Sequence, residues 1–238
     1  MTMYVFDMDG TLTPARKPME DNFAEKFLPW LKENKTYIAT GSDFKKVQEQ
    51  MREDIIQAFS GIFCAMGNVL WQKGEIIYNR DFEPEKEMIL DLENFRKNTK
   101  YPFELFPNYI EKRTGALNFC TLGRNCPYEA REKYSNWDKE NKERLAIQEF
   151  LSKKYSRYDF SLGGAISIDI VKKGCGKGQI ASELRKISPD EKIIFFGDKT
   201  FPGGNDYELA SVLMKMKNTE VVQVNDPYEV LEFLKINR

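Results

Sequence analysis

Four aspartates follow apolar runs at positions that suit a site for phosphoryl transfer. They are Asp7, Asp9, Asp198 and Asp206. The first two follow the run at residues 4–6, and the last two follow the run at 193–196. If both runs are buried parallel strands, their carboxyl ends meet at one edge of the sheet. Carboxylates in an open cluster there are suited to Mg²⁺, which also offsets repulsion between an anionic nucleophile and a phosphate.

The spacing of Asp7 and Asp9 predicts a separate catalytic role for each. As a nucleophile, Asp7 would form an acyl-phosphate and divide one difficult displacement into two easier steps, while Asp9 would act as general acid and base. Ser42 and Lys177 would hold the transferring phosphoryl group. Taken singly, each motif has an ordinary alternative as a turn, a helix cap or a surface charge. The order of the motifs after predicted strands favours catalysis. We predict metal binding by Asp7, Asp9, Asp198 and Asp206.

Composition excludes several other classes of function. The 238 residues include 36 Lys and Arg against 37 Asp and Glu, so no overall charge favours nucleic acid or an anionic membrane as a partner. There is no histidine, which excludes Ser-His-Asp catalysis and histidine-based zinc sites. The four cysteines lack zinc-ligand spacing, and we interpret them as reduced thiols. No apolar run has the length of a membrane helix, so we expect a soluble, cytoplasmic protein.

Strands and helices alternate at both ends of the chain, which predicts an α/β fold with a parallel sheet. Helical patterns occur at residues 20–34 and 44–59, and Pro29 is expected to kink or divide the first of them. Between residues 82 and 171 the pattern changes to antiparallel α+β material that contains a long charged helix at 127–155.

We therefore expect two domains. Residues 1–81 and 174–238 would form the catalytic core, and residues 82–173 would form a substrate-binding insertion.

The motifs resemble those of the haloacid dehalogenase superfamily. The corresponding segments are Asp7-Met8-Asp9-Gly10-Thr11, Thr40-Gly41-Ser42-Asp43, Lys177, and Gly197-Asp198 with Asn205-Asp206. Longer strings within 9–16, 41–50 and 195–206 resemble eukaryotic-type phosphomannomutases in particular, and the likeness covers nearly the whole chain.

This resemblance implies a haloacid dehalogenase-like, Rossmann-like core with an inserted α+β cap. It also implies that the protein interconverts mannose 6-phosphate and mannose 1-phosphate, with Mg²⁺ and a hexose 1,6-bisphosphate activator. Hexose phosphates would be its ligands, and a homodimer would form through the cap. The substrate-binding residues implied by the resemblance are Arg16, Arg113, Arg124, Arg131, Ser167 and Asp169.

Physical chemistry agrees with a sugar-phosphate site in the insertion. Three guanidinium groups would bind a second phosphate, and Ser167 and Asp169 alternate along a strand, so that they face the same side. Any one of these arginines has the alternative of being a surface charge, and only the joint pattern favours binding. A sugar-phosphate phosphatase of the same fold and a non-catalytic sugar-phosphate-binding protein remain alternative functions.

Three segments depart from the family pattern. Thr40-Gly41-Ser42 has one glycine where the family usually has a glycine pair before the serine. Ala65-Met66 replaces an acid and an amide, and the acidic loop associated with a further metal is absent beyond Asp206. We therefore expect one essential Mg²⁺.

Overall fold

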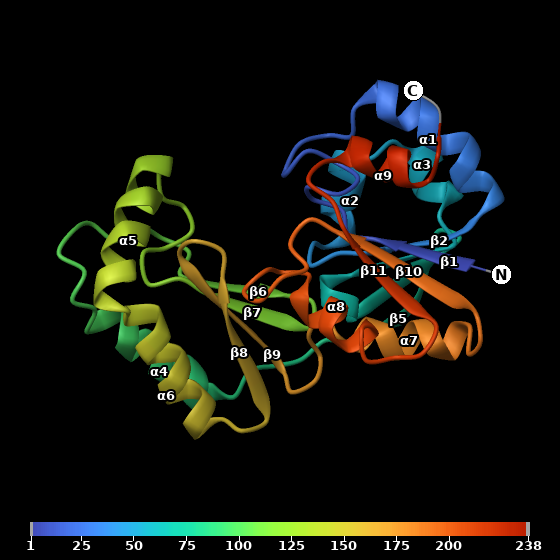
Figure 1. The fold of residues 1–238 in the computed structure, drawn as a ribbon. Coiled ribbons are helices and arrows are strands. Elements are labelled where there is room, and N and C mark those ends of the chain that lie inside the picture. Colours follow the sequence, from blue (N-terminus) through green and yellow to red (C-terminus); the bar gives the residue numbers. More distant parts are fainter. Residues whose placement is uncertain (1, 237–238) are drawn as a thin grey trace. The chain divides into compact units, whose positions relative to one another are not determined.

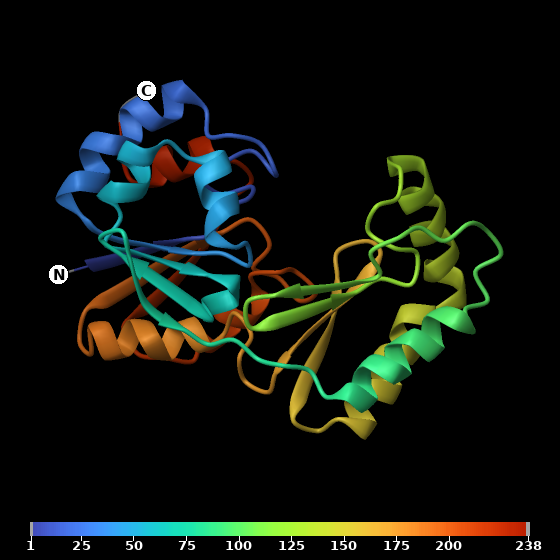
Figure 2. The ribbon, with the colours of Figure 1, turned by 180° about the vertical axis from the view of Figure 1, so that it is seen from behind.

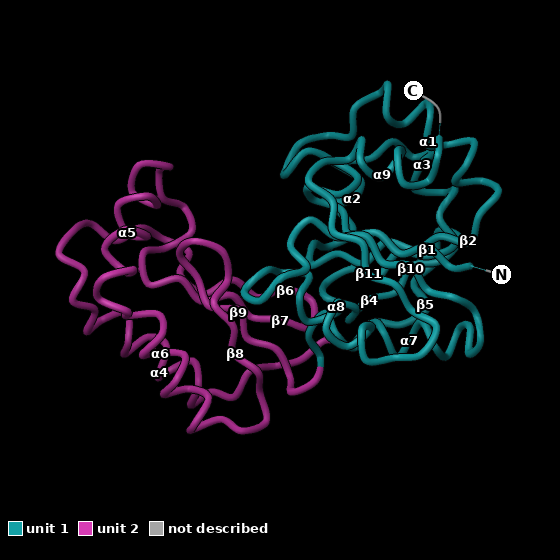
Figure 3. The backbone as a smooth tube through the Cα atoms, in the orientation of Figure 1, with its two compact units in different colours: residues 1–80, 175–238 teal, residues 81–174 magenta. Residues whose placement is uncertain are grey.

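Strand β1 (Thr2–Phe6) lies between two parallel neighbours in the larger of two sheets (Figure 1). The structure is a computed structural model that describes residues 2–236. The chain divides into unit 1, within residues 1–80 and 175–238, and unit 2, residues 81–174 (Figure 3). The predicted roles of such units as catalytic core and substrate-binding cap stay predictions.

The sheet of unit 1 has parallel strands around β1 and an antiparallel extension at one edge. Its order is β11 (Thr219–Gln223), β10 (Lys192–Gly197), β1, β2 (Lys35–Ala39), β3 (Gly61–Cys64), β4 (Val69–Gln72) and β5 (Glu75–Asn79). The pairs from β11 to β3 are parallel, whereas β4 and β5 run antiparallel. The chain moves from β1 outward in both directions, and ligands bind at the carboxyl ends of strands where the order reverses in this way.

Helices cover both faces of this sheet (Figures 1 and 2). One face packs against α1 (Asp21–Glu33), α2 (Phe44–Gln50), α3 (Glu53–Ala58) and α9 (Pro227–Phe233), and the other packs against α7 (Gln179–Ile187) and α8 (Tyr207–Leu213). Strand side chains alternate between the two cores, so that Phe6 and Phe196 enter the first and Val5 and Phe195 enter the second. A 3₁₀ turn, η1 (Ala65–Gly67), follows β3.

Two predicted helices of unit 1 differ from the structure. Pro29 was expected to kink or divide the first helix, and the division is wrong because α1 runs through Pro29 as one helix. Pro29 and Glu25, whose carbonyl loses its partner, are both exposed, so solvent can satisfy that carbonyl. The predicted helix 44–59 is divided at Met51, which has extended backbone. This break frees the Gln50 carbonyl to accept a hydrogen bond from the Met19 amide at 2.7 Å.

Unit 2 contains an antiparallel sheet with a covered face and a polar face. Its order is β6 (Ile110–Arg113), β7 (Ala116–Phe119), β9 (Ser167–Lys172) and β8 (Tyr158–Gly163). Helices α4 (Lys86–Lys97) and α6 (Glu143–Lys154) pack on one face against Leu117, Phe119, Ile168 and Ile170. The alternate side chains of the same strands therefore point to the opposite face.

The predicted helix 127–155 is also divided. Helix α5 (Tyr128–Asn141) ends at Lys142, whose φ of 55° is left-handed, and α6 begins at Glu143. The buried Asp138 carboxylate explains the break, because it accepts hydrogen bonds from both the amide and the Nε of Arg144, at 2.9 and 2.7 Å.

The predicted α/β class with an inserted α+β segment is confirmed. None of the helices within residues 2–236 combines the length and the apolar character that a bilayer-spanning segment requires.

Candidate active site

A tight turn after β1 brings the first motif against the end of β10. The Gly10 amide donates to the Thr13 carbonyl at 2.7 Å, and the Leu12 amide donates to that of Met8 at 2.9 Å. Gly10 has a φ of 88°, and a Cβ atom there would lie 2.5 Å from Oδ2 of Asp198. A side chain at this position would therefore be strained and would also force the two loops apart.

Asp7, Lys177 and Asp206 form a buried ionic group beyond these strand ends. Lys177 precedes α7 and donates through Nζ to Oδ1 of Asp7 at 2.6 Å and to Oδ1 of Asp206 at 2.5 Å. The three side chains are 3%, 4% and 0% exposed in chain order, so solvent screens their charges very little. The group contains two carboxyl groups and one ammonium, so it has a net negative charge when both carboxyl groups are ionised.

Burial and the neighbouring charges shift the pKa values of Asp7 and Lys177. Burial raises the pKa of Asp7 to about 7, with a further increase from Asp206 and an opposing effect of Lys177. Burial disfavours the Lys177 ammonium, but the Asp7 and Asp206 carboxylates outweigh this cost and raise the pKa of Lys177 above its usual range. Lys177 is therefore a permanent positive charge beside the Asp7 carboxylate.

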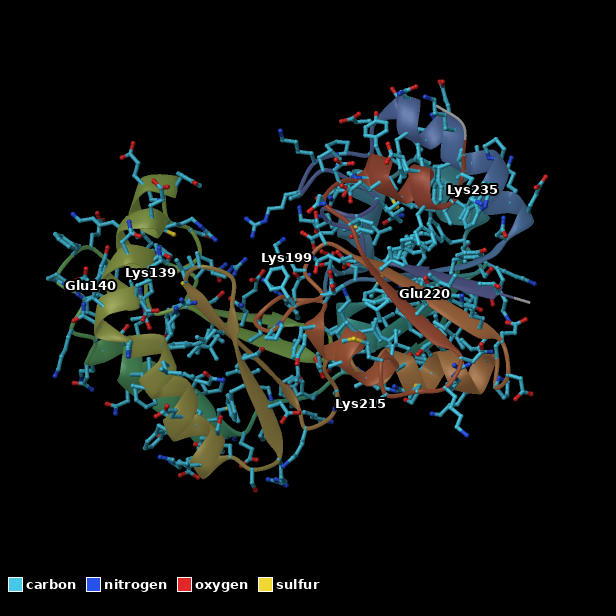
Figure 4. All side chains as sticks on the ribbon, viewed as in Figure 1. Lys139, Glu140, Lys199, Lys215, Glu220 and Lys235 are labelled. Carbon is cyan, nitrogen blue, oxygen red and sulfur yellow. The ribbon has the colours of Figure 1, made fainter. Side chains whose placement is uncertain are left out.

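Asp7, Asp198 and Asp206 present carboxylate oxygens that lie within 4.8 Å of one another. Oδ2 of Asp7 and Oδ1 of Asp198 are buried without a hydrogen-bond partner, and such oxygens are satisfied by a cation. The donor set therefore fits a hard divalent cation. Lys199 lies on the loop after β10 (Figure 4). Its ammonium group, on a side chain that is half exposed, pairs with Asp198.

The Asp9 carboxylate lies outside this group of three and has different partners. Its Oδ1 accepts hydrogen bonds from Nε2 of Gln50 at 2.9 Å and from the amide of Arg16 at 2.6 Å. Arg16 is exposed and has a left-handed φ of 60°. The role of Asp9 as a metal ligand stays a prediction. The hydrogen bonds from Gln50 and Arg16 fix the orientation of its carboxylate.

The second motif positions Ser42 after β2. Asp43, rather than Ser42, caps α2, since its side chain accepts from the Lys46 amide at 2.9 Å. The carbonyl of Ser42 accepts from the Ala65 amide at 2.8 Å, which fixes the backbone of the half-buried serine. The Ser42 hydroxyl is therefore not committed to the helix cap.

The polar face of the unit 2 sheet brings together several of the predicted substrate residues. Nη2 of Arg113 donates to Oε2 of Glu111 at 2.7 Å, and Nε of Arg124 forms an ion pair with the same oxygen at 2.9 Å. Nη1 of Arg124 donates to Oδ1 of Asn118 at 2.9 Å, and Nδ2 of Asn118 donates to Oδ1 of Asp169 at 2.6 Å. Four of the five residues lie on sheet strands, and Arg124 lies on the loop after β7.

Two further predicted residues of unit 2 make no hydrogen bond or ion pair with this network among the described residues. Ser167 is two residues before Asp169 on β9, and its hydroxyl donates to the Gly163 carbonyl at 2.8 Å. Arg131 lies on α5, where it lines a hollow of about 200 Å³ together with Tyr128 and Ala165.

With these sites defined, we compared the chain with known proteins. A model of the eukaryotic phosphomannomutase family matches residues 24–235. The chain belongs to this family. A phosphomannomutase from Galdieria sulphuraria is 35% identical over 87% of this chain and 84% of its own length. Phosphomannomutase 2 from Dictyostelium discoideum is 30% identical over 98% of this chain and 95% of its own length.

Comparison with solved structures finds the same fold in proteins other than phosphomannomutases. A trehalose-6-phosphate phosphatase structure from Aspergillus fumigatus matches 98% of this chain and 91% of that chain, with a TM-score of 0.61 and 19% identity. The predicted haloacid dehalogenase-like fold and the predicted phosphomannomutase family are therefore both confirmed. Phosphomannomutases are enzymes, and the chain is a member of an enzyme family.

Besides Lys199, several polar residues that were not predicted contact the predicted site residues of this phosphomannomutase family member. They include Gln50, Glu111 and Asn118. Gln50 had a detectable signal, since it is a polar residue three positions after Val47 on the buried side of a predicted helix. Glu111 alternates with Arg113 along a strand, but its pairing with Asn118 depends on strand register, which the sequence does not reveal.

Proposed function

We propose that this protein is a phosphomannomutase that interconverts mannose 6-phosphate and mannose 1-phosphate. The observation that carries the proposal is the pair of arginines that converge on Glu111 in unit 2, in addition to the acidic centre with Lys177 in unit 1. A mutase must bind one phosphate of a sugar bisphosphate while the other reacts, whereas a phosphatase has less need of a second anion site. Membership of the phosphomannomutase family supports the same function.

In this proposal, Asp7 carries the phosphoryl group as an acyl-phosphate. A sugar hydroxyl attacks phosphorus, the bond between phosphorus and the Asp7 oxygen breaks, and Asp9 takes the hydroxyl proton. In the reverse transfer Asp7 attacks and Asp9 returns the proton to the departing oxygen. Both observed hydrogen bonds to Asp9 use Oδ1, so we propose that Oδ2 carries the proton.

The groups around Asp7 stabilise charge during these steps. Lys177 holds a positive charge next to Asp7, and the Ser42 hydroxyl would donate to an oxygen of the transferring group. Mg²⁺, held by Asp7, Asp198 and Asp206, would offset the negative charges of the carboxylate and the phosphate. A hexose 1,6-bisphosphate would phosphorylate Asp7 at the start and would also be the intermediate of each turnover.

The predicted substrate-binding residues would bind the parts of the substrate that do not react, namely the second phosphate and the sugar hydroxyls. Arg113, Arg124 and Arg131 would bind the non-reacting phosphate through their guanidinium forks. Ser167 and Asp169 share one face of β9 and would form hydrogen bonds with sugar hydroxyls. The Ser167 hydroxyl can donate or accept, and the Asp169 carboxylate accepts. Arg16, beside Asp9, would contact the substrate in unit 1.

One experiment tests this function directly. The protein is incubated with mannose 1-phosphate, Mg²⁺ and a trace of glucose 1,6-bisphosphate, and mannose 6-phosphate and free phosphate are measured together. We expect mannose 6-phosphate to be the main product, and we expect chelation of Mg²⁺ by EDTA to abolish its formation. Dominant release of free phosphate would instead identify a phosphatase. Binding of the sugar phosphate without either product would identify a non-catalytic binding protein.

A homodimer formed through residues 82–173 is also part of this proposal. Leu90 on α4 and Phe150 on α6 are 63% and 45% exposed, and apolar side chains of this kind are suited to an interface. Light scattering on the purified protein gives the mass, and a monomer at all concentrations would contradict the dimer.

A further inference from the structure

Glu111, Asn118 and Asp169 form a row across three strands of the unit 2 sheet. Glu111 lies opposite Asn118 in the pairing of β6 with β7, and Asn118 lies opposite Asp169 in the pairing of β7 with β9. Directly opposed residues of antiparallel strands project from the same face and are close enough to interact. The three side chains therefore share the polar face, opposite the face that packs on α4 and α6.

This row connects with both arginines of the same face. One oxygen of Glu111 accepts a hydrogen bond from Arg113 and forms an ion pair with Arg124, so the two guanidinium groups are held within reach of a single atom. Two positive charges at this separation repel each other, and a carboxylate between them offsets the repulsion. Asn118 then accepts from Arg124 and donates to Asp169, which extends the connection to a predicted sugar-binding residue.

We propose that Glu111 and Asn118 are positioning residues for the sugar phosphate. Glu111 holds Arg113 and Arg124 together as one preformed anion site, and Asn118 links the position of that site to the Asp169 carboxylate. This inference rests on the proposed function. It adds two residues that act through the substrate-binding side chains and do not touch the reacting atoms.

The contacts leave enough hydrogen-bond donors for a phosphate. Each guanidinium group has five N–H donors, and in this network Arg113 and Arg124 each use one of them in a hydrogen bond. With two positive charges and one negative charge among them, Glu111 and the two arginines retain a net charge of about +1 toward an anion. Glu111 can therefore position the arginines without neutralising the site.

Asn118 has the buried position that a linking residue requires. It is 2% exposed, whereas the side chains of Glu111 and Arg124 are 35% and 25% exposed. Its amide supplies one acceptor and one donor, and these face Arg124 and Asp169 respectively. Neither a carboxylate nor an aliphatic side chain could satisfy both neighbours at once.

The test compares Glu111→Gln with the wild-type protein in steady-state assays with mannose 1-phosphate. Loss of the carboxylate charge should raise KM about tenfold, the effect of one charge-assisted hydrogen bond, while kcat changes by less than about twofold. Glu111→Asp keeps the charge and should recover most of this loss. Glu83→Gln is the matched control, because Glu83 pairs with Lys112 on the opposite side of β6, and this variant should leave KM unchanged.

Several outcomes would overturn the proposal. A lower KM in Glu111→Gln would show that the carboxylate competes with phosphate, and an unchanged KM or a loss in kcat alone would show that it does not position the arginines. Asn118→Ala should also raise KM, and the double variant should show less than the product of the two single effects, because both act in one network. A fully multiplicative effect would contradict the link through Asn118.

A binding measurement separates this inference from the proposed function. Calorimetric titration of mannose 1-phosphate into each protein, without bisphosphate, should give a Kd that is about tenfold higher for Glu111→Gln than for the wild type. If the wild type makes no mannose 6-phosphate, the mutase proposal fails, but this difference in Kd still decides the role of Glu111. Equal Kd values would exclude that role whatever the catalytic activity.

Discussion

The acidic centre of unit 1 and the polar face of unit 2 both hold opposite charges in contact, but they differ in exposure. Lys177 and Asp7 have side chains that are 4% and 3% exposed, whereas Arg113 and Glu111 are 36% and 35% exposed. Charges in the buried centre interact strongly because little water screens them, and charges on the polar face interact weakly. Substitutions in the buried centre should therefore have large effects. On the polar face, an arginine can exchange one anionic partner for another.

This difference matches what each region would do in a mutase. A nucleophile must keep one geometry through every transfer, and buried partners impose that geometry on Asp7. A site that binds, releases and rebinds a phosphate needs guanidinium groups that can replace a carboxylate or water with a phosphate oxygen. The following substitutions test whether the two regions differ in this way.

The largest effect is expected from Asp7→Asn, which removes the proposed nucleophile. We expect kcat to fall roughly 10⁴-fold, because neither phosphoryl transfer can pass through an amide. The fold should not suffer, because Lys177 retains Asp206 as its partner and the buried group loses one of its two negative charges. Steady-state assays, trapping of the phosphoenzyme and thermal unfolding check these expectations. Retained formation of an acid-stable phosphoenzyme would rule out Asp7 as the nucleophile.

The second prediction is that Lys177→Met destabilises the fold where Asp7→Asn does not. Removal of the ammonium leaves two buried carboxylates without their positive partner, and such a change costs about 3–5 kcal/mol of the free energy of unfolding. Lys199→Met is the matched control, since Lys199 pairs with Asp198 nearby but is 50% exposed, and we expect a loss of about 0–1 kcal/mol. Urea unfolding in the presence of EDTA measures both. Equal losses in the two variants would contradict the contrast between buried and exposed charges.

Much of unit 1 could be predicted from the sequence because its signals are local. Asp7 and Asp198 each follow an apolar strand directly, and the topology of a parallel sheet brings their carboxyl ends together. The divided helices were missed because each break accompanies a contact that the periodicity of apolar residues does not reveal. The break after Gln50 depends on the contact of its carbonyl with Met19, and the break at Lys142 accompanies the contacts of Asp138 with Arg144.

The polar face of unit 2 was only partly predictable. The predicted residues Arg113, Arg124 and Asp169 do lie in one network of hydrogen bonds and ion pairs, but two of its members, Glu111 and Asn118, were not identified. Their positions follow from the register of β6 with β7 and of β7 with β9. A shift of register by one residue would move each side chain to the opposite face, and composition and spacing do not fix that register.

The smallest effect is expected from Gly163→Ala, which tests the polar face with one methyl group. A Cβ atom at Gly163 would lie 2.4 Å from Oδ2 of Asp169, so the carboxylate must move and weaken its 2.6 Å hydrogen bond with Asn118. We expect a KM for mannose 1-phosphate that is about threefold higher, an unchanged kcat, and a loss of about 1 kcal/mol in stability.

Gly164→Ala provides the control for this last substitution. No atom lies within 4 Å of a Cβ at Gly164, but its φ of 53° is strained for alanine, so we expect a loss of about 1 kcal/mol without a change in KM. The two variants would then have similar thermal stability and would differ only in substrate affinity. If both raise KM equally, the effect comes from loosening of the β8–β9 turn. If only Gly163→Ala raises KM, the position of the Asp169 carboxylate determines how tightly the sugar phosphate binds. Small structural changes on the polar face of unit 2 would then cause small changes in affinity, whereas changes in the buried centre of unit 1 cause large losses.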